Sequence, residues 1–279
     1  MKYLLFLFIF IFSNEAFAED LPMPGGGTIQ YTDKDLYKWD TPNFVILGIN
    51  DLQGYQVSQQ IEKIKEWSIR RWGLPIDPFV CRPKVVCVPN KAVLKKLFRL
   101  DNSFAESRPE EDVCWVICDG DLSHAISVFT TEFCISNFER VHKTKICYWA
   151  RRGMSILNGD TQRVRAFVSP LSGHIASNRK LLFSEPLFTL DKKALIKSSP
   201  DNVALFDKEA TLLCLMLRKE FGQVRFLWLI TDSSTDSVRR ATGFSSYAEF
   251  DKAFKRYLYY ASTDITQGRM PNSYLNVKN

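Results

Sequence analysis

The chain has 279 residues, of which 46% are hydrophobic and 13% aromatic, and it carries a formal net charge of +6. This composition excludes an intrinsically disordered chain and is sufficient for one large domain or two closely packed lobes. The positive charges are scattered along the sequence, which permits weak attraction to anionic surfaces but does not favour nucleic-acid binding.

Residues 1–18 have the pattern of a secretion signal. Lys2 precedes an apolar run from Tyr3 to Phe12, and Ala16 and Ala18 supply the small residues at which a signal peptidase cuts. No later segment has the roughly 20 consecutive apolar residues that span a bilayer. We therefore expect an exported, soluble protein, either periplasmic or secreted, with no transmembrane segment once the signal is removed.

The first half of the mature chain alternates predicted strands and helices. Residues 19–42 are rich in glycine, proline and aspartate, so they are predicted to be a flexible lead-in. The predicted elements that follow are a strand at 43–48, a helix at 56–72, a strand at 85–88, a helix at 91–100 and a strand at 113–118. This order predicts an α/β lobe over residues 43–160, in which helices pack on a small mixed sheet.

The second half is predicted to be a mainly helical lobe over residues 161–260, followed by a C-terminal tail at 261–279. The predicted helices are one at 203–220 that Gly222 ends, one at 236–242 that Gly243 ends, and one at 245–260 with Ser246 as its N-cap. The buried face of the last helix is predicted to consist of Phe250, Phe254, Tyr257 and Leu258. The expected fold class is therefore α+β.

Two segments between these halves carry the candidate site. Val128–Phe138 predicts a buried helix with a single carboxylate, Glu132, among apolar neighbours. Tyr148–Ile156 predicts the start of a helix that contains the adjacent arginines Arg151 and Arg152. Taken alone, the two segments indicate only a buried carboxylate and a basic helix start.

The order of elements over residues 43–260 resembles the gluzincin-like zinc peptidases of the peptidase MA group. In that family, a layer of strands and helices precedes a helix with H-E-x-x-H, a second helix with W-x-x-E-G and a helical tail. The segments similar to the family's tail are Leu217–Gly222, Phe226–Ile230, Ala241–Ser245 and Phe250–Leu258. Each of these elements occurs in many folds, so the resemblance rests on their order and spacing.

The resemblance implies a zinc site that has lost its ligands. In the family, two histidines one helical turn apart and a glutamate from the second helix bind zinc, and the glutamate of H-E-x-x-H acts as the base. The matching positions hold Thr131, Glu132 and Ile135 in the first helix and Arg152 in the second. An arginine offers a positive charge and no lone pair to a metal ion. We therefore expect a vestigial site with no metal, no cofactor and no catalytic residue.

The surviving carboxylate needs a partner if it is buried. We hypothesise that Glu132 and Arg152 form an ion pair, because a guanidinium can bind a carboxylate through two parallel hydrogen bonds. The alternative is that Arg152 points into solvent beside Arg151, while Glu132 caps a nearby backbone group.

The seven cysteines leave several pairings open. On the resemblance, a disulfide between Cys134 and Cys147 would join two elements that zinc holds together in the family; two buried free thiols are the alternative. Cross-strand pairing is a further option for the cysteines of the predicted strands, Cys81, Cys87, Cys114 and Cys118. Cys214 lies in a predicted helix core and is predicted to be a free buried thiol.

Other polar residues give weaker signals. None of the three histidines, His124, His142 and His174, has a histidine four residues away, so they do not predict a metal site. A basic group consisting of Arg140, Lys143, Lys145, Arg151 and Arg152 is either an anion-binding or partner surface or a solvated face.

The resemblance also implies a substrate cleft beside the strand that precedes the zinc helix. That strand would comprise Val113, Cys114, Trp115, Val116, Ile117 and Cys118, and an extended peptide would add to it. The expected function is an exported, catalytically inactive pseudopeptidase that binds a peptide or protein without cutting it. Two alternatives remain: an active hydrolase with a nonstandard site, and a structural or envelope-assembly protein.

Overall fold

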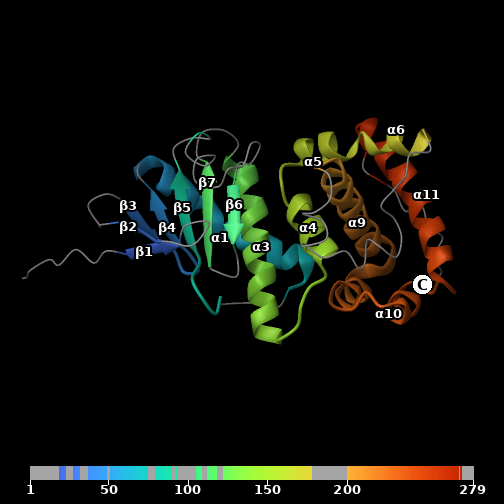
Figure 1. Cartoon of the computed structure of the whole chain (residues 1–279), viewed down its shortest axis with the longest axis horizontal. Coiled ribbons are helices and arrows are strands. Elements are labelled where there is room, and N and C mark those ends of the chain that lie inside the picture. Colours follow the sequence, from blue (N-terminus) through green and yellow to red (C-terminus); the bar gives the residue numbers. More distant parts are fainter. Residues whose placement is uncertain are drawn as a thin grey trace, which may run out of the picture.

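The computed structural model describes residues 19–22, 28–31, 37–48, 51–74, 79–88, 92, 105–108, 112–117, 122–177, 200–269 and 271. The predicted signal at 1–18, Cys118 and, apart from residue 92, the predicted helix at 91–100 lie outside these residues. The fold is mixed α+β, as predicted, with a small mixed sheet and a helical C-terminal part (Figure 1).

Five short strands form one mixed sheet in the order β3-β4-β5-β7-β6. The strands are β3 (Tyr37–Asp40), β4 (Val45–Gly48), β5 (Lys84–Val88), β6 (Ala105–Arg108) and β7 (Val113–Ile117). The three central strands, β4, β5 and β7, are parallel, and the outer strands β3 and β6 are antiparallel to their neighbours. Helix α1 (Asp51–Trp72) connects β4 to β5, because parallel neighbours require a crossover connection.

Residues 19–42 are not simply the flexible lead-in that their composition predicts. β1 (Glu19–Pro22) pairs with β2 (Thr28–Tyr31) in a separate two-stranded sheet. β3 pairs with β4, from Tyr37 opposite Gly48 to Asp40 opposite Val45. The partner that holds β3 in the sheet is the buried strand β4, which is not visible in the sequence of residues 19–42.

The central strands send alternate side chains to two buried faces of the sheet. One face joins the main core, which continues through the helices as far as α11. The opposite face forms a second apolar cluster that consists of Leu47, Val86, Val88, Val113, Trp115 and Ile117. All five residues of β7 are buried, which is typical of an interior strand with both faces covered.

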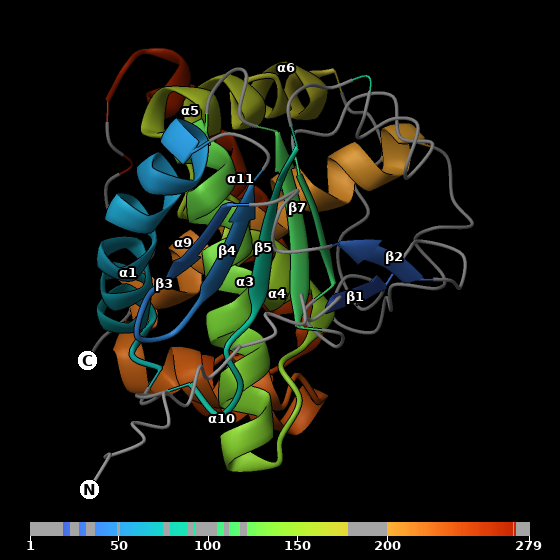
Figure 2. The same ribbon diagram turned by 90° about the vertical axis from the view of Figure 1, so that its left-hand side faces the viewer.

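Helix α3 (Leu122–His142) lies at the centre of the molecule, between the sheet and the helical part (Figures 1 and 2). From Phe129 to Phe138, every residue except Glu132 is buried. A helix that is enclosed on all sides needs apolar residues around its whole circumference, so it lacks an amphipathic stripe. The prediction of a buried helix with one carboxylate is confirmed.

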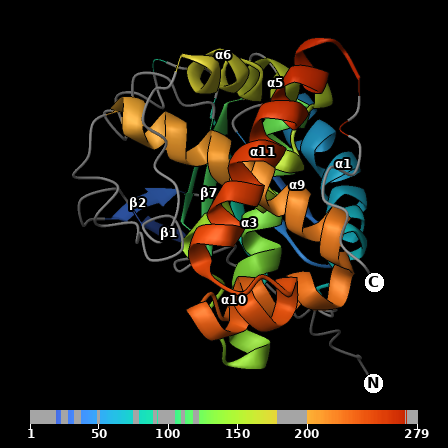
Figure 3. The ribbon, with the colours of Figure 1, turned by 90° about the vertical axis from the view of Figure 1, so that its right-hand side faces the viewer.

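The C-terminal part consists of α4 (Tyr148–Leu157), α5 (Thr161–Val168), α6 (Leu171–Ala176), α9 (Pro200–Thr231), α10 (Thr235–Thr242) and α11 (Tyr247–Thr266). Helices α10 and α11 pack against α9 on the side away from the sheet (Figure 3). Helix α11 continues to Thr266, so the boundary predicted at residue 260 falls within it. Among the described residues, no helix combines the length and apolar character needed to cross a membrane.

Local signals predicted the helix ends correctly. Gly222 has a φ of 77° and interrupts α9, and Gly243 ends α10 in the left-handed conformation. The side chain of Ser246 accepts a hydrogen bond from the Glu249 amide and caps α11. The four side chains predicted to be buried on α11 are at most 1% exposed.

Helices α4 and α9 pack very closely at Gly153. A Cβ atom added to Gly153 would lie 2.3 Å from the carbonyl oxygen of Ala210 and 2.6 Å from Sγ of Cys214. Only glycine therefore fits at this crossing without a shift of one helix. The contact fixes the position of the neighbouring residue Arg152 relative to α9.

We expect Gly153→Ala to lower the free energy of unfolding by about 2 kcal/mol, because the added methyl group overpacks the contact between α4 and α9. The measurement is urea denaturation followed by circular dichroism. The control is Gly173→Ala in α6, where an added Cβ meets no atom within 4 Å and stability should be unchanged or slightly higher. An equal loss of unfolding free energy in the two variants would contradict the close packing of α4 on α9.

Candidate functional site

Arg152 lies between two carboxylates that come from different helices. Its Nε and Nη2 donate hydrogen bonds to Oδ1 and Oδ2 of Asp207 on α9, at 2.9 and 2.6 Å. Its Nη1 lies 3.8 Å from Oε1 of Glu132 on α3. The side chains of Asp207, Glu132 and Arg152 are 10%, 13% and 31% exposed. These three residues, which we call the ion cluster, connect α3, α4 and α9.

The predicted ion pair between Glu132 and Arg152 is present, but it is the weaker of two contacts made by the guanidinium. The two parallel hydrogen bonds go to Asp207, which the sequence analysis did not single out. Asp207 lies 55 residues from Arg152 in the chain, so no local pattern connects them. The available signal was a carboxylate near the start of a predicted apolar helix, but Glu209 stands only two residues further on, so the sequence did not single out Asp207.

The alternative orientation of Arg152 into solvent beside Arg151 does not occur. Nη2 of Arg151 donates to Oε2 of Glu139 at 2.6 Å, and Oε1 of the same carboxylate accepts a hydrogen bond from the Ile146 amide at 2.8 Å. The two adjacent arginines therefore bind carboxylates on different helices, and Arg151 supports the loop between α3 and α4.

The electrostatics of the ion cluster keep the guanidinium charged. Burial alone would lower the pKa of Arg152, but the charge and hydrogen bonds of Asp207, with the charge of Glu132, outweigh burial and raise that pKa. Burial raises the pKa of the neighbouring Tyr148, so its phenol is neutral at physiological pH. With both carboxylates ionised, the ion cluster carries one net negative charge.

The other two vestigial positions lie in different surroundings. Thr131 donates a hydrogen bond to the Ser127 carbonyl at 2.8 Å and accepts one from Nδ2 of Asn158 at 2.6 Å. Its hydroxyl also lies 3.2 Å from Oγ of Ser68 on α1. Ile135 is fully buried in the main core. The four predicted positions thus form one ion pair, one buried polar contact and one core residue rather than a single polar site.

The described residues contain no group of three or more histidine, cysteine, aspartate or glutamate side chains that could hold a metal ion. The guanidinium of Arg152 supplies the positive charge between the two carboxylates of the ion cluster. The histidines are engaged separately: Nδ1 of His124 accepts the Asp160 amide at 3.0 Å, and the ring of His142 packs on that of Phe138.

The disulfide between Cys134 and Cys147 is not formed, and the alternative of two free thiols applies. The two side chains have different surroundings. Cys134 is completely buried in α3, whereas Sγ of Cys147 accepts a hydrogen bond from Oγ of Ser233 at 3.1 Å. Cys81, Cys87 and Cys114 are also free, so these three form no cross-strand disulfide. Cys214 is a free buried thiol, as predicted.

The strand predicted to line a substrate cleft, from Val113 to Cys118, is in the wrong place to receive a peptide. Strand β7 pairs with β5 on one side and with β6 on the other, so both of its edges already have partners. Among the strands that the structure describes, β6 is the last one on this side of the sheet. The sequence of β6, Ala105–Arg108, has no alternation of apolar and polar residues, which explains why it was not predicted.

The predicted basic group does not form a single anion-binding surface, because its three arginines bind carboxylates. In addition to the pairs of Arg151 and Arg152, Nη1 of Arg140 lies 2.6 Å from Oδ1 of Asp112. Lys143 and Lys145 are exposed. This segment is better described as paired arginines with two solvated lysines.

Searches of protein-family models and of curated proteins return no match to this chain. The likeness to gluzincin-like peptidases therefore remains a prediction from the residues themselves.

The geometry predicts unequal roles for the two carboxylates of the ion cluster. Asp207→Asn should lower the free energy of unfolding by about 2 kcal/mol, because it weakens two charged hydrogen bonds. Glu132→Gln should cost less than about 1 kcal/mol, because its contact with Arg152 is long and includes no hydrogen bond. Urea denaturation measures both. A larger loss for Glu132→Gln would show that Asp207 is not the main partner of Arg152.

The more deeply a cysteine is buried, the more slowly its thiol should be labelled. Cys81 is exposed, whereas burial raises the pKa of the Cys134 and Cys214 thiols. Each unit of increase in the pKa of a thiol lowers its fraction of reactive thiolate about tenfold. In the folded protein at pH 8, a water-soluble maleimide should therefore modify Cys81 first and leave Cys134 and Cys214 unmodified until the protein unfolds. Peptide mapping by mass spectrometry gives the order, and a disulfide-linked Cys134–Cys147 peptide would contradict the structure.

Proposed function

We propose that this chain is an exported, catalytically inactive protein of gluzincin-like fold that binds an extended peptide or protein segment without cleaving it. The observation that carries the proposal is the position of Arg152. This residue matches the third zinc ligand of the family, and its guanidinium is held by Asp207 and Glu132. On the resemblance, a protein cation held by carboxylates takes the position of a metal ligand in the family.

The residues at the matched positions do not suit metal-assisted hydrolysis. In that chemistry the metal activates a water molecule and stabilises the negative charge that develops on the carbonyl oxygen. Thr131 uses its hydroxyl for buried hydrogen bonds, Ile135 has no donor atom for a metal, and Arg152 would repel one. Glu132 remains as a carboxylate beside an arginine.

The sheet supplies the basis for peptide binding. Among the described strands, β6 is paired on one side only, with β7. An extended peptide can add to such an edge through main-chain hydrogen bonds. Helix α3, which carries Glu132, packs against β6 as well as against α4 (Figure 1). A peptide added to β6 would therefore run along the side of the sheet where α3 lies.

Glu132 is suited to contact such a peptide. In the described part of the chain its carboxylate has the 3.8 Å contact with Arg152 and accepts no hydrogen bond. The side chain is partly exposed, so its oxygen atoms can accept hydrogen bonds from an incoming amide or amine. We assign Glu132 a binding role rather than the role of a general base.

Hydrogen exchange with a library of extended peptides tests the proposal. A binding peptide should slow exchange of the amides in 105–108, and mass spectrometry should show the peptide intact after prolonged incubation, with or without added zinc. Successive residues of a strand point their N–H groups to opposite sides. Of Glu106 and Ser107, one points its N–H away from β7. Replacing that residue with proline should therefore abolish the slowing of amide exchange by the peptide without breaking the pairing of β6 with β7.

The two alternative functions give different results in the same experiment. Cleavage that persists in the presence of a chelator would identify an active hydrolase with a nonstandard site. If the protein captures an envelope partner but binds no peptide, and the amides of β6 exchange as fast as before, the protein is a structural or assembly protein. Either result would overturn the peptide-binding proposal.

A further inference from the structure

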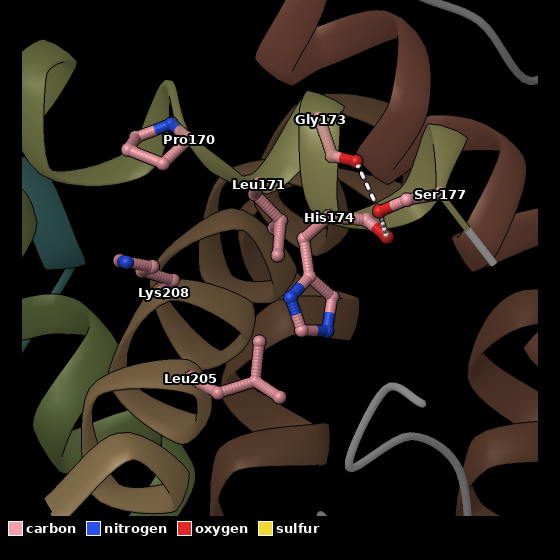
Figure 4. A pocket seen from close by; sticks show the side chains of 7 residues that line it. All are labelled: Pro170, Leu171, Gly173, His174, Ser177, Leu205 and Lys208. Carbon is pink, nitrogen blue, oxygen red and sulfur yellow. Dashed lines mark hydrogen bonds between the residues drawn. The ribbon is translucent and has the colours of Figure 1, made fainter. Parts of the chain in front are cut away.

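A pocket of about 390 Å³ lies between α6 and α9, outside the ion cluster (Figure 4). Its lining comes from the turn before α6, from α6 itself with the following Ser177, and from the first half of α9. Figure 4 shows the imidazole of His174 extending from α6 toward Leu205 of α9, with Lys208 on the other side of the pocket. The volume lies within the range of small-molecule sites, near its lower end.

The polar lining groups favour a negatively charged ligand. Among the described residues that line the pocket, the polar side chains are those of Lys208, His174 and Ser177, and none of these lining residues carries a carboxylate. The hydroxyl of Ser177 donates to the carbonyls of Gly173 and His174 at 2.8 and 3.2 Å, so its oxygen can only accept from a ligand. The charge that selects the ligand is therefore that of Lys208.

Lys208 keeps its charge available to the pocket. The neighbouring carboxylate in the chain, Asp207, is bound to Arg152. Nζ of Lys208 lies 5.5 Å from the centre of the Phe167 ring, and no carboxylate of the described residues lies within ion-pair distance of it. A cation held over an aromatic ring retains most of its capacity to attract an anion, because the ring contact is weak.

The remaining lining is apolar, which defines the rest of the ligand. Pro170 is exposed and Leu205 is partly exposed, so both contribute apolar surface, whereas Leu171 is almost completely buried. A bare inorganic anion would leave this surface unused. We propose that the pocket binds a small organic carboxylate, whose charged group faces Lys208 and whose short apolar group packs on Pro170 and Leu205.

Histidine NMR signals offer a direct test, because the chain has only three histidines. Titration with benzoate should shift the His174 signals with a Kd on the order of 1 mM and leave those of His124 and His142 in place. His174→Gln identifies the signals by removing them. Benzamide, which has the same shape without the charge, should shift the His174 signals at least about tenfold more weakly.

Two variants separate pocket binding from nonspecific attraction. Lys208→Met should weaken benzoate binding at least about tenfold, whereas Lys252→Met, on the exposed face of α11, should not change it. Unchanged benzoate binding in Lys208→Met, equal binding of benzamide, or a His174 signal that does not move would overturn the proposal. None of these outcomes depends on peptide binding at β6.

Discussion

The bidentate ion pair between Arg152 and Asp207 is the interaction on which the arrangement of the central helices depends. It connects α4 to α9 beside the close contact at Gly153, and the same guanidinium faces Glu132 on α3. Removing the cation would leave two largely buried carboxylates near each other, which is far more costly than losing one exposed salt bridge. The sequence can thus tolerate a carboxylate within the apolar helix α3 because an arginine from the next helix compensates it.

The same interaction relates the fold to the proposed function. In a metal site, a cation supplied from solution would hold these helices together and carry out chemistry. Here the cation is a side chain with fixed hydrogen bonds, and it stabilises the three helices while offering no open coordination position. Among the described strands, β6 offers a sheet edge with α3 packed beside it, and Glu132 is a partly exposed carboxylate. These features suit recognition of an extended segment rather than its hydrolysis.

The comparison of sequence and structure separates local signals from long-range ones. Gly222, Gly243 and Ser246 were predicted correctly because a backbone turn or a cap depends on a few neighbouring residues. Strands β3 and β6 were not predicted, because each is only four residues long and is held by a partner strand outside its own segment of the chain. The same difference between local and long-range signals explains why the site was predicted only in part. Glu132 and Arg152 followed from segments close in the chain, whereas Asp207 enters the ion cluster only through the packing of α9 on α4.

The proposed function implies that positions 131, 135 and 152 correspond to the ligands of one metal site, although their present side chains lie in different surroundings, and restoring the ligands tests this most directly. The variant Thr131→His/Ile135→His/Arg152→Glu should bind one zinc ion per chain, with zinc raising its Tm, while the unmodified protein binds none. A matched control with the same residue types at displaced positions, Thr130→His/Ser136→His/Arg151→Glu, should not bind zinc. If the restored variant folds, as judged by circular dichroism, and still binds no zinc, the three positions do not share a site and the likeness to a peptidase is wrong.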